Sequence, residues 1–240
     1  MPFDITLHPV AAEDLERFVF DVWREPALAE VRAAELTDDV AKVRFVVEAI
    51  YGAFPAWHQT LEEGGELSFG KTLGLSCAAV AGFRHDYVYT GSSALSFAAE
   101  ALPALDLFSP LTRSVTGAAG FAAQGEDHGR LVDNYSASGL LLPERFDELR
   151  QGLELLEARR KAHPALFALF RDADRAALDE ALSYAEARGL ALLEAADLVE
   201  PGQRRGSTDL DRLRARRPLD ISEAPSASNQ REAPINDLFP

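Results

Sequence analysis

The stretch from Phe83 to Tyr89 carries the densest set of side chains suited to recognising another molecule. Aromatic rings or an imidazole occupy every second position, and an arginine and an aspartate stand between them. A period of two is typical of a β-strand, here with one aromatic face. Such a strand either packs its rings into a core or presents a tyrosine-rich surface of the kind common at protein interfaces. The residues that we predict to contact a partner are Arg84, His85, Asp86, Tyr87, Tyr89 and, if a second strand region lies alongside, Tyr135.

Gly65 to Thr72 follows the pattern G-x-x-x-x-G-K-[ST] letter for letter. In this it is similar to the phosphate-binding loop of nucleotide hydrolases. The resemblance implies that Lys71 reaches the terminal phosphates, that Thr72 holds magnesium, and that Gly65 and Gly70 enclose a loop of phosphate-binding backbone amides. Such a loop follows a buried strand, whereas residues 57–63 are polar and predict a helix. Nucleotide hydrolysis is therefore the alternative hypothesis and not the leading one.

Residues 74–78, Gly-Leu-Ser-Cys-Ala, resemble the G-x-S-x-G turn of serine hydrolases, with alanine in the last position. The resemblance implies a nucleophile at Ser76, with triad partners drawn from Asp127, His128 and Asp133. That turn lifts its serine between a strand and a helix, and only the helix is predicted here. Serine hydrolysis is accordingly the second form of the enzyme alternative.

The spacing of histidines and cysteines predicts neither a metal site nor a cofactor. No histidine has another histidine three or four residues away, and Cys77 is the single cysteine, so a disulfide within the chain is excluded. The sequence starts without a secretory signal, and its longest apolar run, from Thr72 to Phe83, is shorter than the ~20 residues of a membrane helix. We expect a cytoplasmic protein without membrane contact. The prevalence of alanine, leucine and arginine suggests a bacterial source.

Acidity is the most pronounced property of the composition. The 39 Asp and Glu residues outnumber the 24 Lys and Arg residues, which gives a formal net charge of -15. A charge of this sign repels nucleic acids and anionic membranes and favours a basic protein as partner. An arginine cluster near the C-terminus has the opposite sign, and we expect it to fold back on the acidic body rather than to bind nucleic acid. The cluster consists of Arg204, Arg205, Arg212, Arg214, Arg216 and Arg217.

Helical periodicity accounts for most of the first 200 residues. Pro143 suits the first turn of a helix, Asp174 suits an N-cap, and Gly189 suits the C′ position at which a helix ends. Residues 190–199 are apolar enough for a buried strand or a last turn. The expected helices cover about residues 15–23, 38–52, 67–83, 92–102, 143–156, 163–170 and 174–188.

These signals predict a mainly α fold of the α+β class: a multi-helix single domain over residues 1–200 with a small β element around residues 83–90 and 131–142. A Pro- and Arg-rich segment over residues 201–240 is expected to be a flexible tail. The leading functional hypothesis is a non-catalytic acidic protein that neutralises or regulates a basic protein partner, as a bacterial toxin immunity protein does. The alternative is an enzyme of one of the two kinds named above.

Overall fold

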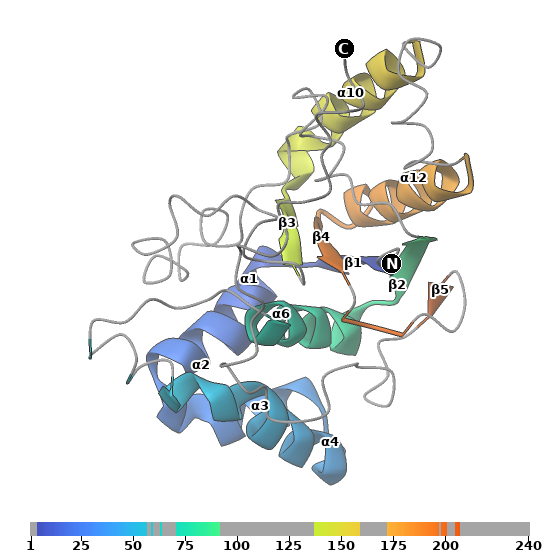
Figure 1. Ribbon diagram of the computed structural model, residues 1–240. Coiled ribbons are helices and arrows are strands. Elements are labelled where there is room, and N and C mark those ends of the chain that lie inside the picture. Colours follow the sequence, from blue (N-terminus) through green and yellow to red (C-terminus); the bar gives the residue numbers. More distant parts are fainter. Residues whose placement is uncertain are drawn as a thin grey trace, which may run out of the picture.

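An antiparallel sheet between two helical layers makes up the part of the chain that the computed structural model describes (Figure 1). This part comprises residues 4–56, 59, 63, 71–91, 137–158, 172–196, 198–200 and 205–206. The sheet has five strands in the spatial order β3, β4, β1, β2, β5, and all neighbours run antiparallel. The strands are β1 (Ile5–Val10), β2 (Tyr87–Gly91), β3 (Ala137–Leu141), β4 (Ala191–Ala196) and β5 (Arg205–Gly206).

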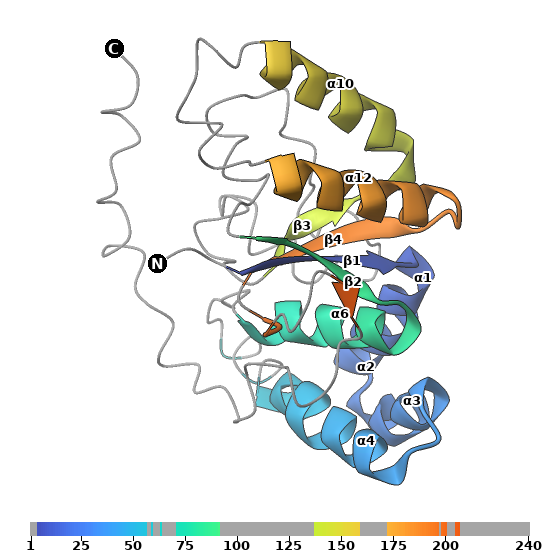
Figure 2. The same cartoon turned by 90° about the vertical axis from the view of Figure 1, so that its right-hand side faces the viewer.

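The helices between β1 and β2 form the N-terminal layer, which covers one face of the sheet (Figure 2). Its first helix continues through α1, η1 and α2 with helical backbone angles at both junctions. The helix expected at about residues 15–23 is confirmed, and its Leu15, Phe18 and Trp23 side chains are buried. The elements of this layer are α1 (Ala12–Leu15), η1 (Glu16–Phe20), α2 (Asp21–Arg24), η2 (Pro26–Leu28), α3 (Ala29–Leu36), α4 (Val40–Phe45), η3 (Val46–Ile50), η4 (Tyr51–Ala53) and α6 (Lys71–Arg84).

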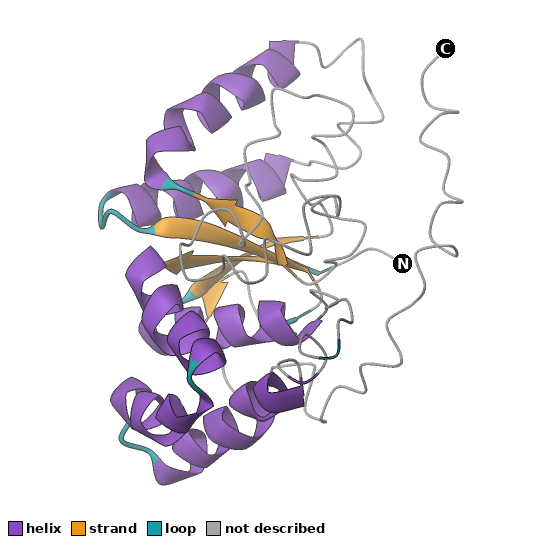
Figure 3. Cartoon of the chain, turned by 90° about the vertical axis from the view of Figure 1, so that its left-hand side faces the viewer, coloured by secondary structure: helices purple, strands orange, loops and turns teal. Residues whose placement is uncertain are grey.

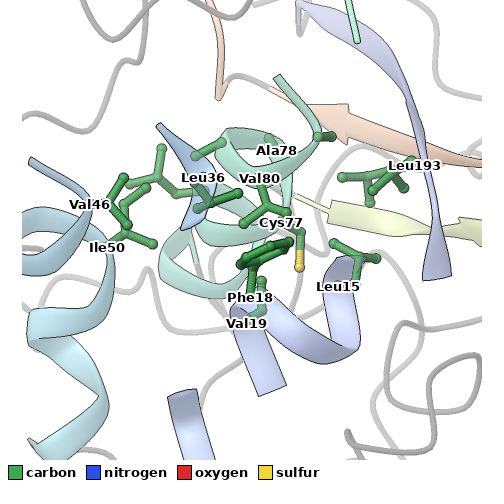
Figure 4. Packing of buried hydrophobic residues seen from close by; sticks show 14 of the residues in the cluster. Leu15, Phe18, Val19, Leu36, Val46, Ile50, Cys77, Ala78, Val80 and Leu193 are labelled. Carbon is green, nitrogen blue, oxygen red and sulfur yellow. The ribbon is translucent and has the colours of Figure 1, made fainter. Parts of the chain in front are cut away.

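Helix α6 lies between the sheet and the other N-terminal helices. Residues 74–81 are all buried, as expected for a helix that is enclosed on every side. Figure 4 shows Cys77 and Val80 of this helix in one cluster with Phe18 of η1 and Leu193 of β4. The apolar run in the sequence therefore marks a helix buried in the core.

Helices α10 (Phe146–Ala158) and α12 (Asp172–Glu186) cover the opposite face (Figure 3). Pro143 opens the short turn η7 (Pro143–Arg145) that leads into α10, which confirms its predicted place at a helix start. Helix α12 begins two residues before the predicted N-cap, Asp174. Its end is confirmed: Gly189 has φ 64, and the Leu190 N–H donates to the Ala185 carbonyl at 2.9 Å, as in a Schellman motif.

Strand β1 and residues 191–195 of β4 are buried on both faces because helices cover both. Leu192 of β4 packs with α10 and α12, whereas Leu193 packs with the N-terminal layer. In β3, Leu141 packs with α10 and α12, and Leu140 packs with the N-terminal layer. Continuous apolar sequence is typical of such strands, and residues 190–199 do form a strand where they run from 191 to 196.

The expected strand around residues 83–90 was wrong in its first half. Helix α6 continues to Arg84, and the His85 N–H still donates to the Ala81 carbonyl at 2.9 Å. The strand begins at Tyr87. The alternation of aromatic residues crosses a helix end: Phe83 packs onto the core from the last turn of α6, so it shares no strand face with Tyr87.

The two strand regions at β2 and β3 do not pair with each other, so the condition set for Tyr135 is not met by the described strands. Strands β4 and β1 lie between β3 and β2. The central strand β1 was missed, since its six residues include His8 and Pro9 and show no clear period. The described part is a mixed fold in which helices predominate, as the sequence suggests, and residues 205–206 of the expected tail pair with β2.

Candidate functional site

Three of the predicted contact residues lie together where α6 ends and β2 begins. Arg84 and Asp86 are exposed and His85 is half-buried. Residues from the start of α1 and the end of α12 approach them from opposite faces of the sheet, and Figure 2 shows these helix ends at the same end of the sheet. We call this surface the His85 corner and define it as Asp14, Arg84, His85, Asp86, Tyr184 and Arg188.

His85 and Tyr184 connect the two helical layers at this corner. The His85 Nδ1 atom lies 3.2 Å from the Tyr184 hydroxyl oxygen, and the rings meet edge to face at 5.8 Å and 71°. The Arg188 guanidinium stacks on the Tyr184 ring, with Cζ 3.8 Å from the ring centroid. One of its nitrogens, Nη1, donates weakly to the Tyr184 carbonyl oxygen at 3.4 Å. The tyrosine is thus held between an imidazole and a guanidinium.

The electrostatics of the corner favour a neutral imidazole. Burial lowers the pKa of His85, Arg188 and Arg84 act in the same direction, and Asp14 and Asp86 oppose them. Since the ordinary value is already below 7, His85 is neutral at physiological pH. Arg84 and Asp14 form a loose ion pair, with 3.9 Å between Nε and Oδ2. The corner therefore offers hydrogen-bonding and stacking groups rather than a charged imidazole.

The remaining predicted contact residues are not at this surface. Tyr87 is fully buried and its ring packs 5.9 Å from that of His8, so it belongs to the core of the sheet. Tyr89 is half-buried and donates its hydroxyl to Asp4 at 2.9 Å. Tyr135 lies outside the described residues. Successive side chains of a strand point to alternate faces, so Tyr87 and Tyr89 share one face of the sheet, the face that packs on the N-terminal layer.

Tyr184 and Arg188 were missed by the sequence analysis. Their i, i+4 spacing ahead of the C′ glycine indicates that they meet on one face of a helix end. No such signal connects them to His85, which is 99 residues from Tyr184 in the chain. Their place in the corner is a tertiary contact only.

A second histidine, His8, lies inside the sheet. Its Nε2 atom is 2.9 Å from the Thr6 hydroxyl oxygen, and both side chains are buried. Desolvation lowers the pKa of His8 to about 3. Glu194 is likewise buried in β4, across from Leu7 and from Gly139, whose φ of 140 favours glycine. These groups are enclosed within the described fold and present no open surface.

The phosphate-loop pattern ends at the start of α6, and the serine-hydrolase-like pattern lies within this helix. Lys71 opens this helix, and residues 65–70 of the phosphate-loop pattern lie outside the described part. The described positions that precede the motif are helical or turn, and the Glu63 N–H donates to the Gln59 carbonyl at 3.0 Å. Within the described residues, no strand occurs between Val10 and Tyr87. The strand that aims a phosphate loop is thus missing there.

Ser76 is buried in the middle of α6, so it does not occupy a sharp turn between a strand and a helix. Burial also raises the pKa of its neighbour Cys77, which leaves the thiol protonated. Asp127, His128 and Asp133 lie outside the described residues. The position of Ser76 gives no support to a nucleophile.

The described ranges contain no group of three or more His, Cys, Asp or Glu side chains placed to hold a metal ion. Nor does any helix in them have the length and apolar character needed to cross a bilayer. Comparison of the chain with known protein families, with curated proteins and with solved structures finds no match.

Proposed function

We propose that this protein is a non-catalytic acidic binding protein that neutralises or regulates a basic protein partner, for example as an immunity protein acts on a bacterial toxin. A nuclease toxin is one partner of suitable chemistry, since its active site is basic where it binds nucleic acid. The proposal concerns the surface charge and its distribution, and no reaction is assigned to the chain.

One observation carries the proposal: on the described surface, unpaired carboxylates outnumber unpaired cations. Arginines on the described helices are mostly held in ion pairs, as in the chain of contacts in which Glu35 accepts from Arg17 and Arg32. Seven described arginines have such carboxylate partners: Arg17, Arg24, Arg32, Arg84, Arg145, Arg150 and Arg175. Exposed carboxylates of the described residues that have no such contact include Glu13, Glu25, Glu30, Asp38, Glu48, Glu144 and Glu154.

Because most arginines are held in ion pairs, the excess negative charge of the described surface is carried by exposed carboxylates. A paired arginine contributes little net field, because its charge is compensated within a few ångströms. Lys42, Arg44 and Arg188 are exposed cations without an ion pair in the described part, and they are fewer than the free carboxylates. Complementary charge of this kind accelerates encounter with a basic protein and fixes the orientation of binding.

The first experiment identifies the partner. The tagged chain is recovered from its native host at low ionic strength, and the associated proteins are identified by mass spectrometry. We expect a basic protein in about equimolar amount, released by salt, because exposed charges separated by more than ~8 Å are screened at physiological ionic strength. When the purified chain is added to the purified partner, it should reduce the activity of that partner. Recovery of acidic or uncharged partners alone, or no effect on the partner's activity, would contradict the proposal.

A pair of matched variants tests the charge argument with the same purified partner. The first variant combines Glu13→Gln, Glu25→Gln, Glu30→Gln, Asp38→Asn and Glu48→Gln. The control combines Lys42→Gln and Arg44→Gln, which remove exposed unpaired cations from the same helical layer. We expect the first to slow association roughly tenfold and to weaken its salt dependence, and the control to leave association equal or faster. Equal effects of the two variants would show that surface charge does not drive binding.

A further inference from the structure

The arginine at the end of α12 differs from its neighbours in being stacked rather than paired. The seven arginines with carboxylate partners lie on the helices of both layers, whereas Arg188 is exposed and has no ion pair within the described residues. A chain with 39 acidic residues offers many carboxylates. A cation left without one in this setting is available to a ligand.

The position of the Arg188 guanidinium favours a bidentate hydrogen-bonding contact with a ligand. Its Cζ atom lies over the Tyr184 ring, 3.8 Å from the ring centroid. Its N–H groups lie in the plane of the guanidinium, and only Nη1 has a partner, the Tyr184 carbonyl at 3.4 Å. Stacking on an aromatic ring reduces the rotamer freedom that an arginine loses on binding, and the planar fork matches the two oxygens of a carboxylate or phosphate.

The backbone below Arg188 is also fixed. Arg188 stands just before Gly189 in the Schellman motif, in which the Gly189 N–H donates to Glu186 at 3.1 Å. Tyr184 is anchored in turn by His85 at 3.2 Å. The contacts from His85 to Tyr184 and from Tyr184 to Arg188 therefore hold the guanidinium at the corner.

We propose that the His85 corner is a recognition site for an oxyanion, a carboxylate or a phosphate group, with Arg188 as the bidentate donor and Arg84 as a second cation. His85 lines the site as a neutral hydrogen-bonding group. Asp14 and Asp86 lie near enough to oppose an anion, and Asp14 holds Arg84 only loosely. A free anion therefore binds weakly, with a Kd on the order of 10 mM, and a group presented by a larger ligand binds more tightly.

Titration with two free anions tests the proposal without knowledge of any partner. Sodium acetate and sodium phosphate are added to the full chain at pH 7.5, with sodium chloride keeping the ionic strength constant. NMR follows the His85 Cε1–H and Arg188 Nε–H resonances. We expect a saturable shift of both with acetate, with phosphate or with both, and the effective anion identifies the ligand class. Shifts that grow linearly with concentration, or no shift, would overturn the proposal.

Variants separate a built site from a general charge effect. Arg188→Gln should raise the Kd roughly tenfold or more, because a charge-assisted hydrogen bond is lost, and Arg188→Lys should recover only part of the affinity, because the fork is lost. Arg44→Gln is the matched control, since Arg44 is also exposed and unpaired among the described residues. It should change the Kd less than twofold. Saturation that persists unchanged in Arg188→Gln would place the anion elsewhere. The result is independent of whether a basic protein partner exists.

Discussion

His8 and His85 make similar contacts in two different regions of the molecule. Each imidazole bonds to a hydroxyl, that of Thr6 at 2.9 Å or that of Tyr184 at 3.2 Å. Each also meets a tyrosine ring, at 5.9 Å and 5.8 Å. His8 is 1% exposed inside the sheet, whereas His85 is half-buried at a corner with charged neighbours. The comparison shows that burial and neighbouring charges, and not the paired side chains themselves, separate a structural group from one that can meet a ligand.

The largest expected effect that distinguishes the two histidines is acid destabilisation. The folded pKa of His8 is about 3, below its unfolded value, so the unfolded chain binds the proton more readily. The contribution of His8 to the free energy of unfolding is then at its maximum above pH 6.5. It falls as the pH decreases toward 3, by at most roughly 1.4 kcal/mol per pH unit. Urea unfolding at pH 7, 6 and 5 measures this slope. His85 contributes in the same direction.

The variant His85→Gln serves as the control for this slope. Most of the slope between pH 6.5 and 5 should remain in it, because His8 is more deeply buried. Carboxylates such as Glu35 have lowered pKa values and lose their stabilising effect only below about pH 4.5. Equal stability at pH 7 and pH 5 would refute the assignment of a neutral, buried His8.

Removal of each hydroxyl compares the two regions directly. Thr6→Val takes a hydrogen-bonding partner from a buried imidazole and should cost about 1–3 kcal/mol, whereas Tyr184→Phe at the half-buried corner should cost about 0.5 kcal/mol. Thermal and urea denaturation of both variants at pH 7 provides the values. The ring of Tyr184 still supports Arg188 in the second variant, so anion binding at the corner should persist. A larger cost for Tyr184→Phe would reverse the comparison.

Gly189→Ala tests how strongly the fold fixes the corner. The residue has φ 64, and a Cβ atom there would meet nothing within 4 Å, so any cost comes from the backbone alone. We expect about 1 kcal/mol of destabilisation, because alanine rarely adopts the left-handed conformation. Chemical denaturation gives this number, and Gly52→Ala, at a described glycine without a positive φ, is the control. No loss in Gly189→Ala would mean that the turn tolerates another conformation.

The smallest expected effect concerns the phosphate-loop pattern at Lys71. A nucleotide site at the start of α6 would be a second anion-binding region, so the His85 corner would no longer be the one region of the described fold that we expect to bind an anion. We expect magnesium-ATP to leave the melting temperature unchanged, because the described residues between Val10 and α6 form no strand that could aim a phosphate loop. Differential scanning fluorimetry checks this. A stabilisation that is lost in Lys71→Ala would restore the nucleotide hypothesis.

Local sequence was sufficient to predict several elements of this fold. The helix over residues 15–23, the helix start at Pro143 and the helix end at Gly189 depend on spacing or backbone preference within a few residues. The end of α6 was misplaced because an alternating pattern continues across the boundary between helix and strand. The alternation of side chains does not reveal that the backbone is still helical at Arg84, where the His85 N–H donates to the Ala81 carbonyl.

The sequence by itself determined the acidity of the chain, the dominance of helices and the proximity of Arg84, His85 and Asp86 along the backbone. Only the tertiary structure decided the strand order and the burial of Tyr87, because β1 and β4 insert between β2 and β3 from distant parts of the chain. It also brought Tyr184 and Arg188 to His85. Contacts of this kind arise from the packing of two helical layers on one sheet, which no local periodicity encodes.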